Sequence, residues 1–395
     1  MPRKTLLNSA ALVLAAGFLV LFMSGGARLA VGLTLKPIVE DFHWGRTELG
    51  AAVALFLVVS ALATFAAGHL VDRFSPRLVL RGGLFVSGIG IGLMSVISAP
   101  WHALALYGVL YALGNGAASI VPVGVMVTRA LPDRAGLANS LAMSGLSVGQ
   151  LVVIAAMTAV LATMSWPSVY LLLGVAHLVL LPLLFAAIPK PQPGQARAAR
   201  PGEGLALREA VRTRQFWLLV VIYAVCGFDD FFVTTHVVAF AQDRGADILL
   251  AGNLLALMGL TGLIGVLAGG TWSDRSSPVW PTAFIFAVRV VITALVMIDQ
   301  STLMVAVFAL LFGATFLVTA PLTLVFVAQY FGVRNLGGLA GLITMAHQIF
   351  GGIGAYVGAA VFDLTGTYNA AFTIMLIVSA IALMLTLLLR RGVVA

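Results

Sequence analysis

Long apolar runs alternate with short polar segments along almost the whole chain. Each run reaches about 20 residues or more, enough to cross about 30 Å of hydrocarbon at a rise of about 1.5 Å per residue. Helices are the expected form, because a helix satisfies its own backbone hydrogen bonds in lipid. The pattern predicts an all-α membrane protein with twelve transmembrane helices, at residues 9–39, 47–71, 78–98, 102–128, 136–164, 167–188, 215–241, 249–272, 280–298, 301–329, 336–362 and 368–389.

Composition supports this interpretation and narrows the function. Of the 395 residues, 61% are hydrophobic and only 9% are charged, whereas about a quarter of the residues in soluble domains are charged. The net charge of +8 is spread over short loops, so nucleic acid is not an expected partner. The chain shows neither a polar catalytic cluster nor a soluble domain, so we do not expect an enzyme. With one cysteine and no metal-ligand spacing, we expect no cofactor and no metal.

Basic residues set the expected orientation in the membrane. Twelve spans place both termini on one side, and the loops of alternate sides then differ strongly in Lys and Arg. The poorer side holds only Lys36, Arg46 and Arg244. Because cytoplasmic loops carry the excess of Lys and Arg, both termini are expected in the cytoplasm, with the protein in the cell (inner) membrane. The richer side holds Arg3, Lys4, Arg73, Arg77, Arg81, Arg129, Arg134, Lys190, Arg197, Arg200, Arg208, Arg212, Arg214, Arg275, Arg334, Arg390 and Arg391.

One long polar stretch, residues 189–214, divides the spans six and six. We expect an N-terminal six-helix bundle at residues 1–188, a cytoplasmic linker at 189–214 and a C-terminal six-helix bundle at 215–395. The two halves also match each other at an offset of 202 residues, which carries Asp41 onto Asp243 and Gly68 onto Gly270. A six-helix repeat explains this match.

The loop after the second span carries a recognisable motif. Residues 68–77 contain Gly68, Leu70, Asp72, Arg73 and Arg77, with Ser75 where a second glycine is usual. This pattern resembles the loop signature of the major facilitator superfamily, and the repeat at 270–275 resembles its degraded second copy. The resemblance implies a transporter of two pseudo-symmetric bundles. It also implies a cytoplasmic latch built from Asp72, Arg73, Arg77, Asp274 and Arg275.

Polar residues inside the expected spans are the candidates for function, because a charge at mid-bilayer costs roughly 3 kcal/mol or more. Arg28 maps onto Asp230 at the 202-residue offset. We therefore expect these two to face each other across the transport path, with a permanent salt bridge as the alternative and Asp229 as the other possible facing member. The other polar residues that stand out inside the spans are Asn115, Gln150, His177, His236, Arg289, His347 and Gln348.

Each of these residues has a structural alternative. His236 either relays protons or donates a hydrogen bond to a neighbour, and His347 with Gln348 binds either a polar substrate or a neighbouring helix. Arg289 is expected to snorkel or to clamp a carbonyl, and His177 is expected to be structural. Glycines spaced for close helix contact occur at Gly145, Gly149, Gly262, Gly265, Gly269, Gly354 and Gly358.

Residues 25–44 and 347–368 resemble the monocarboxylate and oxalate/formate transporters of the same superfamily. Transporters of the monocarboxylate type carry a basic residue near the position of Arg28. They also carry an Asp and an Arg in helix 8, where residues 259–269 are apolar apart from Thr261. Aspartates of the seventh span would then supply the acidic group.

We therefore expect alternating-access transport of a small organic anion, a monocarboxylate, together with a proton. Arg28, Asn115, Gln150, His347 and Gln348 are the expected substrate-binding residues. Asp229, Asp230 and His236 are expected to couple the proton. A single chain can contain a complete path.

The alternative is a proton-driven exporter of drugs or other amphiphiles. Such exporters usually carry a proline after the second glycine of the pair in helix 5 and an arginine in helix 4. This chain has Gln150 after Gly149, and Leu110 where the arginine would stand.

Overall fold

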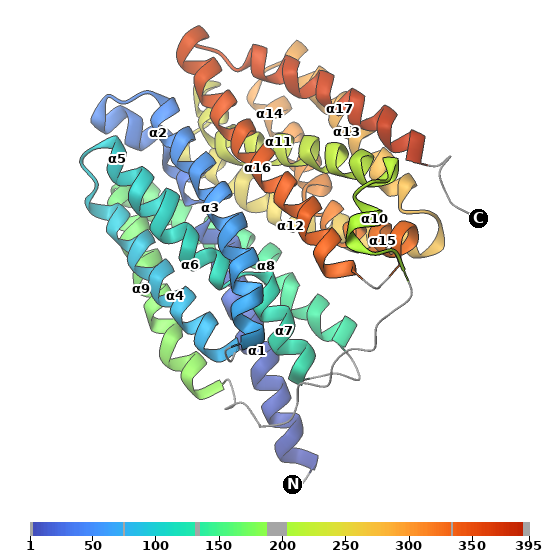
Figure 1. Ribbon diagram of the computed structural model, residues 1–395. Coiled ribbons are helices and arrows are strands. Elements are labelled where there is room, and N and C mark those ends of the chain that lie inside the picture. The colour runs from blue at the N-terminus through green and yellow to red at the C-terminus, as the bar shows by residue number, and fades with distance from the viewer. Residues whose placement is uncertain (1–2, 74–75, 131–134, 188–203, 333–334, 390–395) are drawn as a thin grey trace. The chain divides into compact units, whose positions relative to one another are not determined.

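The computed structural model describes residues 3–73, 76–130, 135–187, 204–332 and 335–389, and these are almost entirely helical (Figure 1). Within them, ten helical segments are long and apolar enough to cross a membrane. Two shorter apolar helices, Trp166–Pro182 and Thr302–Phe316, account for the sixth and tenth expected spans. The only bridge between extended residues in this part of the chain joins Gly204 and Gly332. The predicted all-α membrane fold is confirmed.

The chain divides into two compact units, Met1–Arg197 and Ala198–Ala395. Residues 188–203, which make up most of the predicted linker, lie outside the described residues, so the linker stays a prediction. The first unit contains α1 (Arg3–Ala27), α2 (Ala30–Phe42), α3 (Arg46–Arg73), α4 (Pro76–Leu93), the 3₁₀ turn η1 (Met94–Val96), α5 (Pro100–Ala103), the π-helix η2 (Leu104–Tyr111), α6 (Ala112–Ala117), α7 (Ile120–Ala130), α8 (Ala135–Thr163) and α9 (Trp166–Ala187).

The second unit begins its described part with a short helix and then forms its own set of spans. Side chains cap the N-termini of two of its long helices: Thr213 accepts from Phe216 N, and Asp247 accepts from Leu250 N. The elements are α10 (Leu207–Ala210), α11 (Arg214–Asp243), α12 (Ile248–Arg275), α13 (Val279–Ile298), α14 (Thr302–Phe316), α15 (Thr319–Phe331), α16 (Leu336–Thr365) and α17 (Asn369–Leu389).

Several spans are broken in mid-course. The first breaks between α1 and α2 at Arg28, just after the pair Gly25 and Gly26, and the amide of Leu29 bonds the Gly26 carbonyl instead of continuing the α-helical pattern. The tenth breaks between α14 and α15, where Pro321 has no N–H to bond the carbonyl four residues earlier. A break in a helix leaves backbone carbonyls without their helical partners inside a membrane protein, so these polar groups can bind other groups at the break.

Glycines allow two pairs of helices to touch backbone to backbone. A Cβ atom at Gly149 on α8 would collide with the Phe22 carbonyl of α1. In the second unit, a Cβ atom at Gly354 on α16 would collide with the Phe228 carbonyl of α11. The glycines expected to mark close contacts do so: Gly145, Gly149, Gly262, Gly265, Gly269, Gly354 and Gly358 all lie against a neighbouring helix.

Candidate functional site

The second unit contains a buried ion cluster. Asp229 and Asp230 of α11 flank the guanidinium of Arg289 from α13, and each of the three side chains is at most 2% exposed. Asp230 Oδ1 lies 2.6 Å from Arg289 Nη2, and Asp229 Oδ2 lies 3.6 Å from Arg289 Nη1. Consecutive residues on a helix point about 100° apart. Both carboxylates nevertheless reach Arg289, because its guanidinium lies between them.

The same guanidinium binds the C-terminal end of α14, the first helix of the broken tenth span. Arg289 Nε donates to Thr315 Oγ1 at 3.1 Å and Nη2 donates to the Thr315 carbonyl at 3.3 Å. The C-terminal end of a helix carries a partial negative charge, which a cation stabilises. The ring of Phe312 lies 4.6 Å from the guanidinium carbon. Arg289 therefore joins α11, α13 and α14.

These contacts change two expectations. The idea that Arg289 snorkels is wrong, because its side chain is fully buried, whereas its contacts with the Thr315 and Cys226 carbonyls agree with the alternative of a carbonyl clamp. The second expectation placed Asp230 opposite Arg28 across the transport path. Arg289 supplies Asp230 with a cation within the same unit, and the facing of Arg28 and Asp230 stays a prediction.

The cluster carries more acid than base. When both carboxyl groups are ionised, two negative charges face the single positive charge of Arg289. Ser379 Oγ donates to Asp229 Oδ2 at 2.6 Å, while Asp229 Oδ1 has no hydrogen-bond partner among the described residues. The site therefore holds one uncompensated charge unless it takes up a positive one.

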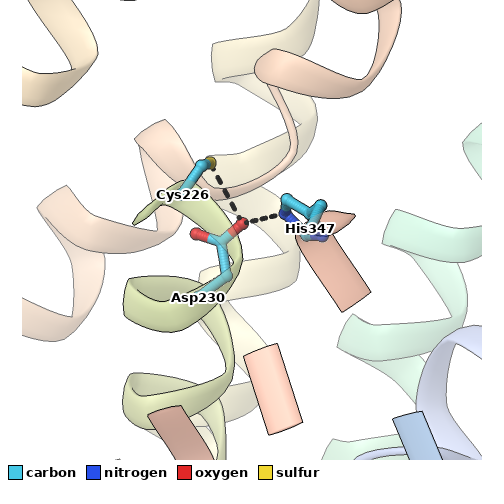
Figure 2. A group of neighbouring side chains, drawn as sticks. All are labelled: Cys226, Asp230 and His347. Atoms are coloured by element: carbon cyan, nitrogen blue, oxygen red, sulfur yellow. Dashed lines mark hydrogen bonds and ion pairs between the residues drawn. The ribbon is translucent and has the colours of Figure 1, made fainter. Parts of the chain in front are cut away.

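Two further side chains converge on Asp230, as Figure 2 shows. His347 Nε2, from α16, lies 3.1 Å from Asp230 Oδ2, and Cys226 Sγ lies 3.5 Å from the same oxygen. The His347 side chain is 18% exposed, unlike the buried carboxyl group it meets. Its neighbour Gln348 is half-buried. His347 is thus the accessible member of the cluster.

His236 lies two turns further along α11 and makes different bonds. Its Nε2 donates to the Ala355 carbonyl at 2.8 Å, which leaves Nδ1 to accept from the Tyr368 hydroxyl at 3.1 Å. Both ring nitrogens are therefore satisfied inside an aromatic environment that includes Phe232. This arrangement fits a hydrogen bond that joins helices, and a role for His236 in proton relay stays a prediction.

In the first unit, the expected substrate residues lie around the break in the first span. Arg28 is half-buried at this break, and the Tyr107 hydroxyl donates to its carbonyl at 2.5 Å. Asn115 Nδ2 donates to Ser24 Oγ at 2.8 Å. Gln150 is buried on α8. Arg28 and Asn115 thus lie near the same tyrosine-lined segment, because Tyr107 stacks on Tyr111, which Asn115 also contacts.

His177 and the expected latch residues are the remaining candidates, and the His177 ring packs edge-on against Tyr111. His177 is buried, and its Nδ1 donates to the Leu173 carbonyl at 2.7 Å, as a structural residue would. Arg77 lies half-buried in the first turn of α4, and Arg275 ends α12 with an exposed side chain. The side chains of Asp72, Arg73 and Asp274 lie outside the described residues. The latch stays a prediction.

Sequence reasoning missed the pairing of Arg289, although a signal was present. Asp229, Asp230 and Arg289 are the only Asp, Glu, Lys or Arg residues in the six spans expected for the second half. Charge complementarity alone therefore pointed to the cluster. Thr315, Ser379 and Cys226 gave no comparable signal, since isolated small polar residues are frequent in apolar helices.

Comparisons with known proteins agree with this architecture. The profile of the Major Facilitator Superfamily matches residues 17–295 and 219–394. A solved structure of a bacterial homolog of the human lysosomal transporter Spinster superposes with a TM-score of 0.79 at 14% identity, covering 96% of each chain.

Three relatives are similar over most of their length. An uncharacterized transporter of the family from Bacillus subtilis, YcxA, is 26% identical over 85% of this chain and 84% of its own. Monocarboxylate transporter 13 from Rattus norvegicus is 23% identical over 88% and 81%. The oxalate:formate antiporter of Oxalobacter formigenes is 25% identical over 92% and 87%. The chain therefore belongs to the Major Facilitator Superfamily and is a multi-pass membrane transporter, not an enzyme.

Proposed function

We propose that this transporter moves a small organic anion, a monocarboxylate, across the cell membrane together with a proton. The observation that carries the proposal is the buried cluster in which Asp229 and Asp230 share Arg289. A net charge held at membrane depth is costly, roughly 3 kcal/mol or more. One proton makes the cluster neutral.

The geometry favours Asp229 as the residue that holds the proton. Its Oδ1 lacks a hydrogen-bond partner among the described residues, whereas Asp230 is held by Arg289, His347 and Cys226. A neutral carboxyl group needs fewer partners than a carboxylate. His347 contacts Asp230 and is partly exposed, so it is the residue through which we propose that protons reach the cluster.

The anion is proposed to bind at Arg28. A guanidinium is a planar fork that matches a carboxylate and stays charged at any working pH. Arg28 lies where the first span is broken, and discontinuous helices commonly form substrate sites in transporters. Asn115, Gln150, His347 and Gln348 are proposed to donate hydrogen bonds to the substrate.

The names of two relatives support the substrate class. One is a monocarboxylate transporter and another is an oxalate:formate antiporter. We further propose that Asp72, Arg73, Arg77, Asp274 and Arg275 form the cytoplasmic latch of the cycle, and that both termini are cytoplasmic.

Uptake of radiolabelled lactate into proteoliposomes, with and without an inward proton gradient, tests the proposal. The wild-type protein is expected to show uptake that the gradient stimulates. Asp229→Asn is expected to lose the stimulation while lactate exchange across the membrane continues, because the neutral amide mimics the protonated carboxyl group. Arg28→Gln is expected to raise the half-saturating lactate concentration at least about tenfold, the loss of a charge-assisted hydrogen bond.

Glu40→Gln is the matched control, since Glu40 is a carboxylate whose side chain is 65% exposed. It is expected to transport as the wild type does. Equal lactate uptake by the wild-type protein with and without the proton gradient would contradict proton coupling. The absence of lactate uptake by folded wild-type protein would contradict the monocarboxylate assignment.

A further inference from the structure

We propose that Cys226, Asp230 and His347 form a binding site for a divalent transition-metal ion of the zinc class. The three side chains come from two helices and converge on one point (Figure 2). Cys226 and Asp230 are four residues apart on α11, so they lie on one face of that helix. His347 reaches them from α16. A thiol, a carboxylate and an imidazole are the donor types that zinc binds in proteins.

Two of the three pairs of donor atoms already stand near coordination distances from each other. Zinc bonds of about 2.3 Å to sulfur and about 2.0 Å to nitrogen or oxygen, at tetrahedral angles, set the donor atoms roughly 3.3–3.6 Å apart. Cys226 Sγ lies 3.5 Å from Asp230 Oδ2, and His347 Nε2 lies 3.1 Å from that oxygen. All three donor atoms lie within 4.8 Å of one another. Only small side-chain movements are needed to admit an ion.

The surrounding contacts support the same arrangement. Arg289 Nη2 holds Asp230 Oδ1, so the other oxygen is left to face the ion. The hydroxyl of Thr319 lies 3.4 Å from Cys226 Sγ, and Arg289 Nη1 lies 3.6 Å from it. Both groups stabilise a thiolate, the form of cysteine that binds metals. Such outer contacts orient the donors of a metal site.

The charges select a divalent ion. The metal displaces the Cys226 thiol proton and any proton that Asp229 holds, and both leave to solvent. The resulting thiolate adds one negative charge to those of the ionised Asp229 and Asp230. Arg289 contributes one positive charge. Two further positive charges from the ion bring the total to zero, so a divalent cation satisfies the buried site without a residual charge.

The donor set also limits the kind of metal. Thiolate and imidazole ligands favour zinc, cobalt and similar transition metals, whereas calcium and magnesium prefer sites made of oxygen atoms alone. The chain supplies three donors, which leaves a fourth position for water. The partly exposed His347 marks the side from which an ion enters.

Cobalt(II) titration of the purified full-length protein, carrying no histidine tag, tests the site. Because Cys226 is the only cysteine of the chain, a thiolate-to-cobalt charge-transfer band can arise only there. We expect one cobalt ion per chain, that band, and the intense visible bands of tetrahedral cobalt, all reversed by added zinc. Magnesium alone is expected to leave the spectrum unchanged.

Variants assign the donors. Cys226→Ser is expected to abolish the charge-transfer band, and His347→Gln is expected to weaken cobalt binding at least about tenfold while keeping the thiol. His43→Asn removes an exposed histidine and is the matched control, with an unchanged titration expected. If Cys226→Ser fails to fold, the His347→Gln titration decides the question.

A folded wild-type protein without the charge-transfer band would overturn the proposal, and so would a His347→Gln variant that binds cobalt as the wild type does. The titration uses no transported substrate. Its failure therefore leaves the proposed anion transport standing, and a failed lactate experiment leaves the metal site standing.

Discussion

Arg289 contacts several polar groups of the buried cluster at once. One guanidinium binds two carboxylates, the carbonyls of Thr315 and Cys226 and the Thr315 hydroxyl. Removal of this cation leaves two carboxylates that are at most 2% exposed without their partner, and breaking a buried pair from one side costs about 3–5 kcal/mol. The residue therefore matters to the stability of the second unit as well as to its chemistry.

Arg289→Met is expected to lower the free energy of unfolding by about 3–5 kcal/mol. The triple variant Arg289→Met, Asp229→Asn, Asp230→Asn is expected to recover more than half of that loss, because it removes the stranded charges together with their partner. Titration with SDS in mixed micelles measures both. A loss of less than about 0.5 kcal/mol in the single variant, the size of an ordinary surface change, would show that stability does not need the ion pairs.

Individual residues show where sequence reasoning succeeds and where it stops. The cost of charge in lipid identified Asp229, Asp230 and Arg289 as residues that need a partner, and each has one. The pairing of Asp230 with Arg289 was missed because internal symmetry linked Asp230 to Arg28, and that link stays a prediction. Symmetry places residues at related positions, whereas side-chain reach decides which of them touch. The approach of His347 to Asp230 depends on how α16 packs on α11, which no spacing along one helix reveals.

At the scale of elements, the packing of α11 against α16 determines the geometry of the cluster. Gly227 and Gly354 bring the two backbones into contact, since a Cβ atom at either would collide with a carbonyl of the opposite helix. His347, whose own carbonyl lies against Gly227, is fixed by this contact at the height of Asp230. The close approach therefore positions the histidine.

Gly354→Ala is expected to destabilise the protein by about 1–3 kcal/mol, the cost of overpacking a close contact. Gly341→Ala on the same helix is the matched control, because a Cβ atom there meets nothing within 4 Å and alanine favours a helix over glycine. Thermal unfolding in detergent compares the two. Equal melting temperatures of the two variants would contradict the idea that the close contact of α11 and α16 at Gly354 stabilises the protein.

The positions of the spans follow from the sequence, but the breaks within them follow only in part. Run length fixes each span because the bilayer fixes the length of its helices. Pro321 explains the break before α15, as Gly25 and Gly26 explain the break at Arg28. The π-helix of η2 contains only a single glycine, Gly108, and no proline. It places the Tyr107 hydroxyl against the Arg28 carbonyl.

For the whole molecule, orientation in the membrane is the feature that charge predicts. The loop between α2 and α3 ends at Arg46, and Lys36 is the other basic residue near it, whereas the opposite side carries most of the Lys and Arg. Both termini are therefore expected inside the cell.

Fusion proteins measure this orientation. Green fluorescent protein fused after residue 395 is expected to fluoresce, and alkaline phosphatase fused there is expected to be inactive. Alkaline phosphatase fused after His43, between α2 and α3, is the control and is expected to be active outside the cytoplasm. Phosphatase activity at the C-terminus would reverse the orientation, and with it the assignment of the latch to the cytoplasmic face.

The single cysteine has a practical consequence for following the transport cycle. Cys226 is fully buried in the second unit, so thiol-directed spin labels or fluorophores are excluded from it while the protein stays folded. Pairs of cysteines introduced on the surfaces of the two units can therefore be labelled in the native background, without first preparing a cysteine-free variant. Distances between such labels report the conformational change of alternating access, and the unlabelled Cys226 does not contribute to the signal.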